Sequence, residues 1–139
     1  YAHHPNEIKE TIKLGRLFIN QKNNDELHKS RLIAIFQPHR YSRAKQFNKE
    51  FADELSKADV IYVTSIYAAG EVNEDKITSK IITDLIYKQN KNVSYINNYH
   101  EITNNFYKLT QKGDLILNMG AGDCHNFWTI LNRKNNSNT

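Results

Sequence analysis

The segment R-L-I-A-I-F, residues 31–36, is a short apolar run that ends at a Gln-Pro pair and is followed by a helical pattern. Three further runs share this character, because they are short, rich in β-branched or aromatic residues and bounded by polar residues or glycine. They are V-I-Y-V-T over 60–64, V-S-Y-I over 93–96 and D-L-I-L-N-M over 114–119. Their continuous apolar character predicts strands of a sheet that is covered on both faces.

Segments with apolar residues at helical spacing separate these strands. The predicted helices cover residues 5–19, 43–57, 79–87, 100–109 and 126–131. Strands that alternate with helices favour parallel pairing through right-handed crossovers. The sequence therefore predicts an α/β fold, an open Rossmann-like, mostly parallel sheet with helices on both faces. Residues 21–30 are expected to form a surface insertion.

Composition limits the class of protein. The chain has 139 residues, 39% hydrophobic and 24% charged, which is too apolar for intrinsic disorder. We expect one domain over residues 1–133 and a polar tail over 134–139. The single Cys124 excludes an internal disulfide and predicts a reducing compartment, and no apolar run is long enough to span a membrane. A net charge of +4 permits an anionic ligand, but the interleaved signs disfavour nucleic acid.

Open α/β sheets bind ligands at the carboxyl ends of their strands, so the segments after the strands form the candidate site. After the first strand, Arg40 and Arg43 stand three residues apart beside a predicted helix start. If this turn is helical, the two guanidiniums share a face and suit a carboxylate or phosphate, although a solvated basic turn is an equal alternative. The loop G-A-G-D over 120–123 lacks the third glycine of a dinucleotide fingerprint, so it predicts an anion-binding turn and no dinucleotide site.

Other reactive groups give weaker signals. The small residues 68–70 before Glu71 allow a ligand to approach the backbone, but a single carboxylate is a weak sign of a metal. His3 and His4 have no Cys or Glu partner at zinc spacing, so we expect no metal site and favour a histidine that hydrogen-bonds an anionic substrate. Cys124 lies at a helix start that can lower a thiol pKa, yet a small semi-buried core residue is the favoured interpretation.

Four motifs follow one another over nearly the whole chain. They are Y-A-H-H-P-N-E-I over 1–8, F-Q-P-H-R-Y-S-R over 36–43, Y-A-A-G-E over 67–71, and G-D-L-I-L leading into G-A-G-D over 113–123. Together they closely resemble the C-terminal domain of the Mur ligase family. The resemblance implies a cytoplasmic, three-domain, ATP-dependent ligase of peptidoglycan precursor synthesis, and this chain would be the Rossmann-like third domain that closes over the active site.

The resemblance also implies a reaction. The full enzyme would join L-alanine to the lactyl carboxylate of UDP-N-acetylmuramate through an acyl phosphate, with ATP and Mg²⁺. Because the phosphate-binding loop belongs to another domain, we expect no catalytic residue, no bound cofactor and no activity in this chain alone. The alternatives are a stand-alone anion- or nucleotide-binding module without catalysis, and an interaction domain whose arginines are solvated.

Site residues follow from the motifs. His3, Arg40 and Arg43 match family residues around the carboxylate of the amino-acid substrate, with Tyr1 and His39 beside them. The pocket is expected to be completed from the last strand by Gly120, Ala121, Gly122 and Asp123.

Overall fold

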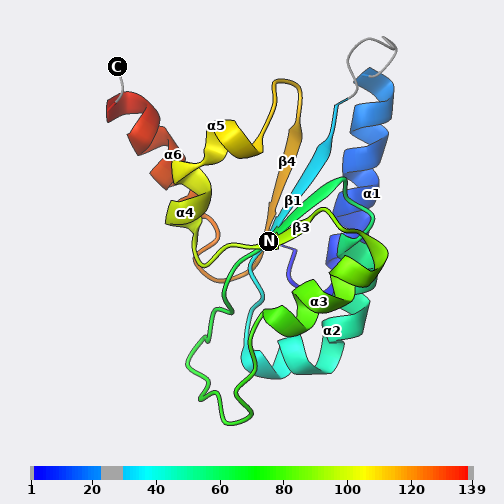
Figure 1. Cartoon of the computed structure of the whole chain (residues 1–139), viewed down its shortest axis with the longest axis vertical. Helices are drawn as coiled ribbons and strands as arrows, with labels where there is room; N and C mark the ends of the chain where they lie inside the picture. The colour runs from blue at the N-terminus through cyan, green and yellow to red at the C-terminus, as the bar shows by residue number, and fades with distance from the viewer. Residues whose placement is uncertain (1, 23–29, 138–139) are drawn as a thin grey trace.

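The computed structural model describes residues 2–22 and 30–137, in which helices and strands alternate along the chain (Figure 1). The elements are α1 (Pro5–Lys22), β1 (Leu32–Phe36), α2 (Tyr41–Leu55), β2 (Val60–Val63), α3 (Lys80–Gln89), β3 (Val93–Tyr95), α4 (Tyr99–Asn104), α5 (Phe106–Leu109), β4 (Leu115–Met119) and α6 (Asn126–Ser137). None of the described helices has the length and apolar character needed to cross a membrane.

The four strands form one parallel sheet in the order β3-β2-β1-β4. β1 lies in its interior, and all of its residues are buried, as expected for the most apolar run in the sequence. Each strand begins and ends within one residue of the prediction. The predicted parallel α/β sheet is confirmed.

Alternate residues of β1 point into two separate cores. Leu32, Ala34 and Phe36 pack against one cluster with residues of α1, α2 and α3. Ile33 and Ile35 pack into the other, with residues of α4 and α6. The three earlier helices therefore lie on one side of the sheet and the three later ones on the other (Figure 1). This arrangement confirms helices on both faces and explains why the strands show no polar alternation.

Two predicted helices differ from the observed ones by more than three residues or by a break. The segment expected as one helix over 100–109 breaks at Asn105, whose side-chain amide donates to the Glu101 carbonyl at 2.9 Å and whose backbone leaves the helical region. The last helix continues to Ser137, so residues 134–137 of the expected polar tail are helical. In the expected insertion over 21–30, the first two residues belong to α1 and residues 23–29 lie outside the described part.

The connections create a topological switch point. The chain leaves β1 for α2 on one side of the sheet and leaves β4 for α6 on the opposite side. β1 and β4 are neighbours, so the carboxyl ends of these two strands form the topological switch point where open α/β sheets bind ligands.

Candidate functional site

The loops that follow β1 and β2 are joined by backbone hydrogen bonds at this edge. The Tyr67 N–H donates to the Pro38 carbonyl at 2.8 Å, and the Arg40 N–H donates to the Tyr67 carbonyl at 2.7 Å. On the other side, the Gln37 N–H donates to the Met119 carbonyl at 3.0 Å, next to the glycine loop. The predicted gathering of the three loops along one edge is confirmed.

His39 is the centre of a cluster of rings and cations. Its ring stacks on Tyr67 with centroids 5.7 Å apart and meets the His3 ring edge-on at 5.9 Å. Arg43 Nη1 lies 3.0 Å from His39 Nδ1. Because a guanidinium can only donate, Nδ1 accepts this bond and the neutral ring carries its proton on Nε2. Burial lowers the pKa of His39, and the charges of Arg43, His3 and Arg40 lower it further.

Arg40 differs from its expected position. It directly precedes α2 with φ 71° and ψ 138°, so Arg40 and Arg43 do not share a helical face. A positive φ is unusual for a residue with a side chain and is held here by the backbone bond to Tyr67. The Arg40 side chain is exposed, and its contacts within the described residues include no hydrogen bond or ion pair. Its guanidinium is therefore available to a ligand.

The glycine loop lies against the same cluster. A Cβ on Gly122 would stand 2.4 Å from Tyr67 Cγ, so only glycine lets this loop approach the ring so closely. Gly120 also packs against the Gln37 backbone, because a Cβ added to Gly120 would lie 3.1 Å from the Gln37 carbonyl oxygen. The side-chain amide of Gln37 donates to the Asp123 carboxylate. The loop after β4 is thereby fixed to the loops after β1 and β2.

Most of the expected site residues therefore come together. His3, His39 and Arg43 are in contact through His39, and the glycine loop with Ala121 reaches them through Tyr67. Tyr1 lies outside the described residues. Tyr67 and Gln37 were assigned no role from the sequence, although both belong to its motifs. Their position in the loops that follow β1 and β2 was the available signal.

Glu7 also joins this region from α1. Ligand atoms of His3, His4 and Glu7 lie within 4.8 Å of one another, a set that could hold a metal ion. The sequence argument against a metal was wrong on one point, because a glutamate partner is present. However, the Glu7 carboxylate already accepts the backbone N–H groups of His3 and His4 at 3.4 and 3.0 Å, so it caps the start of α1.

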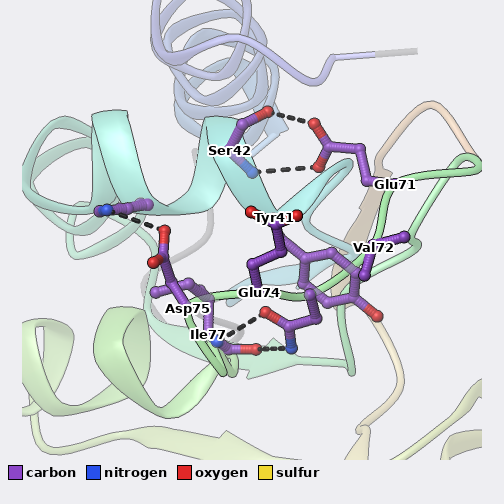
Figure 2. Close-up of a pocket in the computed structure, with 9 residues that line it drawn as sticks. Tyr41, Ser42, Glu71, Val72, Glu74, Asp75 and Ile77 are labelled. Atoms are coloured by element: carbon purple, nitrogen blue, oxygen red, sulfur yellow. Dashed lines mark hydrogen bonds and ion pairs between the residues drawn. The ribbon is translucent and has the colours of Figure 1, made fainter.

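Glu71 has a structural role at the start of α2 (Figure 2). Its carboxylate accepts both the backbone N–H and the hydroxyl of Ser42, and these hydrogen bonds lower its pKa. A pocket of about 420 Å³ lies beside this contact, and Asp75 on its wall is paired with Lys45 at 2.9 Å. The polar groups of this pocket are largely occupied by contacts that tie the loop after β2 onto α2.

Cys124 is buried, and burial raises the pKa of its thiol. This agrees with the expected core role and disfavours a reactive thiolate.

Comparison with known proteins places the chain in a family. The family model of the Mur ligase, glutamate ligase domain, matches residues 1–122. The chain belongs to the Mur ligase family. It is 63% identical over 139 residues to the UDP-N-acetylmuramate–L-alanine ligase of Prochlorococcus marinus subsp. pastoris, covering 99% of this chain and 29% of that protein. It is 42% identical over 125 residues to the enzyme of the same name from Caldanaerobacter subterraneus, covering 90% of this chain and 25% of that protein.

A solved structure supports the fold of this Mur ligase domain. The UDP-N-acetylmuramate-alanine ligase from Thermotoga maritima matches with a TM-score of 0.72 and 23% identity, covering 100% of this chain and 26% of that one. The chain thus spans less than a third of the length of these relatives.

Proposed function

We propose that this chain is the C-terminal domain of a UDP-N-acetylmuramate–L-alanine ligase and that it holds the amino-acid substrate. The 63% identity to a ligase of this name over the whole chain supports the assignment. The structural observation that carries the binding role is the Arg40 guanidinium beside the cluster of His3, His39 and Arg43, because no other described residue pairs with it. We take residues 1–133 as the domain and residues 134–139 as a tail whose first part, residues 134–137, continues α6.

The cluster offers the donors that a carboxylate requires. Arg40 would bind the L-alanine carboxylate through two parallel N–H bonds, which a planar guanidinium provides and an ammonium does not. His3 and Arg43 would add donors, and Arg43 also fixes the ring of His39. Discrimination against glycine rests on one methyl group, about 1–3 kcal/mol, and thus on the shape of the pocket.

The remaining parts of the reaction belong to domains outside this chain. UDP-N-acetylmuramate, ATP and Mg²⁺ would bind there, and the activated carboxylate would form there as an acyl phosphate. This domain would bring the alanine amine to the acyl carbon and exclude water that would hydrolyse the intermediate. Its cationic edge would also stabilise the negative charge of the reacting group. Because both nucleotides are cytoplasmic metabolites, the proposal places the enzyme in the cytoplasm.

A chimera tests this function. The 139 residues would replace the matching C-terminal segment of the Prochlorococcus marinus subsp. pastoris relative. We expect phosphate release that depends on ATP, L-alanine and UDP-N-acetylmuramate together, whereas the relative truncated before this segment should be inactive. A folded chimera without alanine-dependent turnover would favour a stand-alone anion-binding module instead.

A further inference from the structure

Two histidines and a glutamate gather at the start of α1. One ring nitrogen of His3, one ring nitrogen of His4 and a carboxylate oxygen of Glu7 all lie within 4.8 Å of one another. Within the described part of the chain, no other group of three or more His, Cys, Asp or Glu side chains comes together in this way. We call these three residues the His-His-Glu cluster.

The spacing of the ligand atoms is close to that around a single metal ion. Zn²⁺ binds imidazole nitrogen and carboxylate oxygen at about 2.0–2.2 Å, so two ligands of a tetrahedral ion lie about 3.4 Å apart. His3 Nδ1 lies 3.6 Å from Glu7 Oε1, which is already near this separation. The widest gap in the cluster is at most 4.8 Å and must close by no more than about 1.4 Å. The His4 ring is exposed and can make this adjustment by rotating about its side-chain bonds.

The third ligand also holds the backbone that carries the two imidazoles. Glu7 Oε1 accepts the His4 N–H at 3.0 Å and the His3 N–H at 3.4 Å. A carboxylate has about four acceptor positions, so these bonds leave room on it for a metal ion, and ligating carboxylates are commonly hydrogen-bonded in this way. The His3 side chain is 26% exposed and that of Glu7 is 47% exposed, so an ion can reach both from solvent.

The chemistry of the ligands selects among divalent cations. Two imidazoles and one carboxylate suit Zn²⁺, whereas Mg²⁺ and Ca²⁺ require mainly oxygen ligands. The neighbouring arginines strengthen this preference, because the charges of Arg43 and Arg40 act on His39, whose ring centroid lies 5.9 Å from that of His3. These charges repel a hard cation that is held by charge alone, whereas Zn²⁺ forms coordination bonds with neutral imidazole.

We propose that the His-His-Glu cluster is a Zn²⁺-binding site, with His3, His4 and Glu7 as three ligands and water in the fourth position. The alternative is a helix cap in which protonated His3 forms an ion pair with Glu7. The inference goes beyond the proposed function and does not depend on it, although His3 belongs to both sites.

Calorimetric titration of the 139-residue chain with ZnCl₂ tests this site at about pH 7.5, where an ordinary imidazole is neutral. We expect saturable binding of one Zn²⁺ per chain and no saturable heat with MgCl₂ at the same concentrations. In the proton NMR spectrum, Zn²⁺ should shift the ring signals of His3 and His4, and EDTA should restore them. The ring signals of His100, an exposed histidine on α4, should not change.

Two substitutions each remove one ligand. Loss of a group that merely orients a ligand already costs about 10- to 100-fold in metal affinity, so loss of a ligand should weaken Zn²⁺ binding at least about tenfold. His4→Ala removes an exposed imidazole. Glu7→Gln keeps a carbonyl oxygen that can accept the two N–H bonds of the cap, but it removes the charged ligand. His100→Ala, on the other side of the sheet, is the matched control and should bind Zn²⁺ as the unaltered chain does.

Three results would overturn the inference. If the chain binds no Zn²⁺, or binds Mg²⁺ equally well, the cluster is only a helix cap. If His4→Ala and Glu7→Gln bind Zn²⁺ as tightly as the unaltered chain, other groups hold the ion. The ring shifts of His3 and His4 require no variant, so they decide the question even where a substitution disturbs the fold. The titrations use no substrate of the proposed ligase, so a failure here leaves the proposed function standing.

Discussion

Arg40 combines three properties that rarely coincide in one residue. It has a positive φ of 71°, an exposed side chain and a backbone N–H that is tied to Tyr67. A left-handed conformation in a residue with a Cβ costs free energy, which the surrounding hydrogen bonds must offset. The result is an exposed guanidinium on a backbone that is held in place just after β1.

Loss of this guanidinium gives the first prediction. In the active chimera, Arg40→Ala should raise the KM for L-alanine about 30- to 1,000-fold, because a paired charge-assisted contact is lost. The KM for UDP-N-acetylmuramate should stay nearly unchanged, since the proposed function places that substrate on another domain. Arg40→Lys should restore only part of the affinity. Lys49→Ala removes an exposed charge from α2 and is the control. An unchanged alanine KM in Arg40→Ala would show that Arg40 is only a solvated charge.

The contact between Gly122 and Tyr67 gives the second prediction. Gly122→Ala should destabilise the fold by about 1–3 kcal/mol, because the new methyl overlaps the ring of Tyr67. Urea unfolding measures this change. In a Tyr67→Ala background the same substitution should cost much less, since the ring is gone. An equal cost in both backgrounds would mean that the loop, and not the ring, demands glycine.

The pKa of His39 gives the third prediction. Burial lowers it most, and the charge of Arg43 is the next contribution. Arg43→Ala should therefore raise the pKa of His39 towards its ordinary value while leaving it lowered by burial. The proton NMR titration of the imidazole measures the shift. Lys45→Ala, which removes an exposed cation from the same helix, should leave this pKa where it is. A fall of the pKa in Arg43→Ala would contradict the described contact.

At the scale of elements, two ion pairs tie the opposite edge of the sheet together. Arg31, just before β1, pairs with Asp114, just before β4, at 2.8 Å. Asp59, just before β2, binds Arg16 of α1 at 2.8 Å and accepts the Leu32 N–H at 2.7 Å. Both contacts join elements that are far apart in sequence, and both lie away from the proposed substrate edge.

Asp114 gives the fourth prediction. Burial opposes its ionisation, but the hydrogen bonds from Arg31 and from the Gln111 N–H outweigh burial and hold its pKa below the usual range. This contribution to stability is therefore complete above about pH 4, the ordinary carboxyl value, and is lost as the pH falls through the lower folded value.

The side chain of Asp114 is 3% exposed, so Asp114→Asn should cost about 1–3 kcal/mol at neutral pH. Urea unfolding across a pH series should also show a shallower loss of stability in acid for this variant. Asp84→Asn, at an exposed position of α3, should leave the pH profile unchanged. A profile for Asp114→Asn that parallels the unaltered chain would contradict the ion-pair account.

The elements were predictable to different degrees. The two central strands, β1 and β2, followed from composition, because runs buried on both faces must be apolar along their whole length. The break at Asn105 was missed, because the apolar spacing of Ile102, Phe106 and Leu109 continues across it. The extension of the last helix was missed because its final residues carry no apolar pattern.

At the scale of the whole molecule, the chain covers about three tenths of the length of its curated relative from Prochlorococcus marinus subsp. pastoris. This gives the fifth prediction, that the isolated 139-residue chain hydrolyses no ATP and ligates no L-alanine even with Mg²⁺, since its sequence contains no phosphate-binding loop. Phosphate release with all substrates present measures this. Stoichiometric turnover by the pure chain would contradict the proposed domain assignment.

The sequence by itself determined the parallel α/β sheet, the edge that carries the site and the motifs in which His3, His39, Arg40 and Arg43 stand. These features depend on local composition and on the general rule that parallel strands place their carboxyl ends together. Only the tertiary structure decided which side chains meet: Tyr67 between His39 and Gly122, Glu7 beside His3, and Gln37 against Asp123. Such contacts join loops distant in sequence, and their geometry is set by backbone dihedrals and packing that no local pattern encodes.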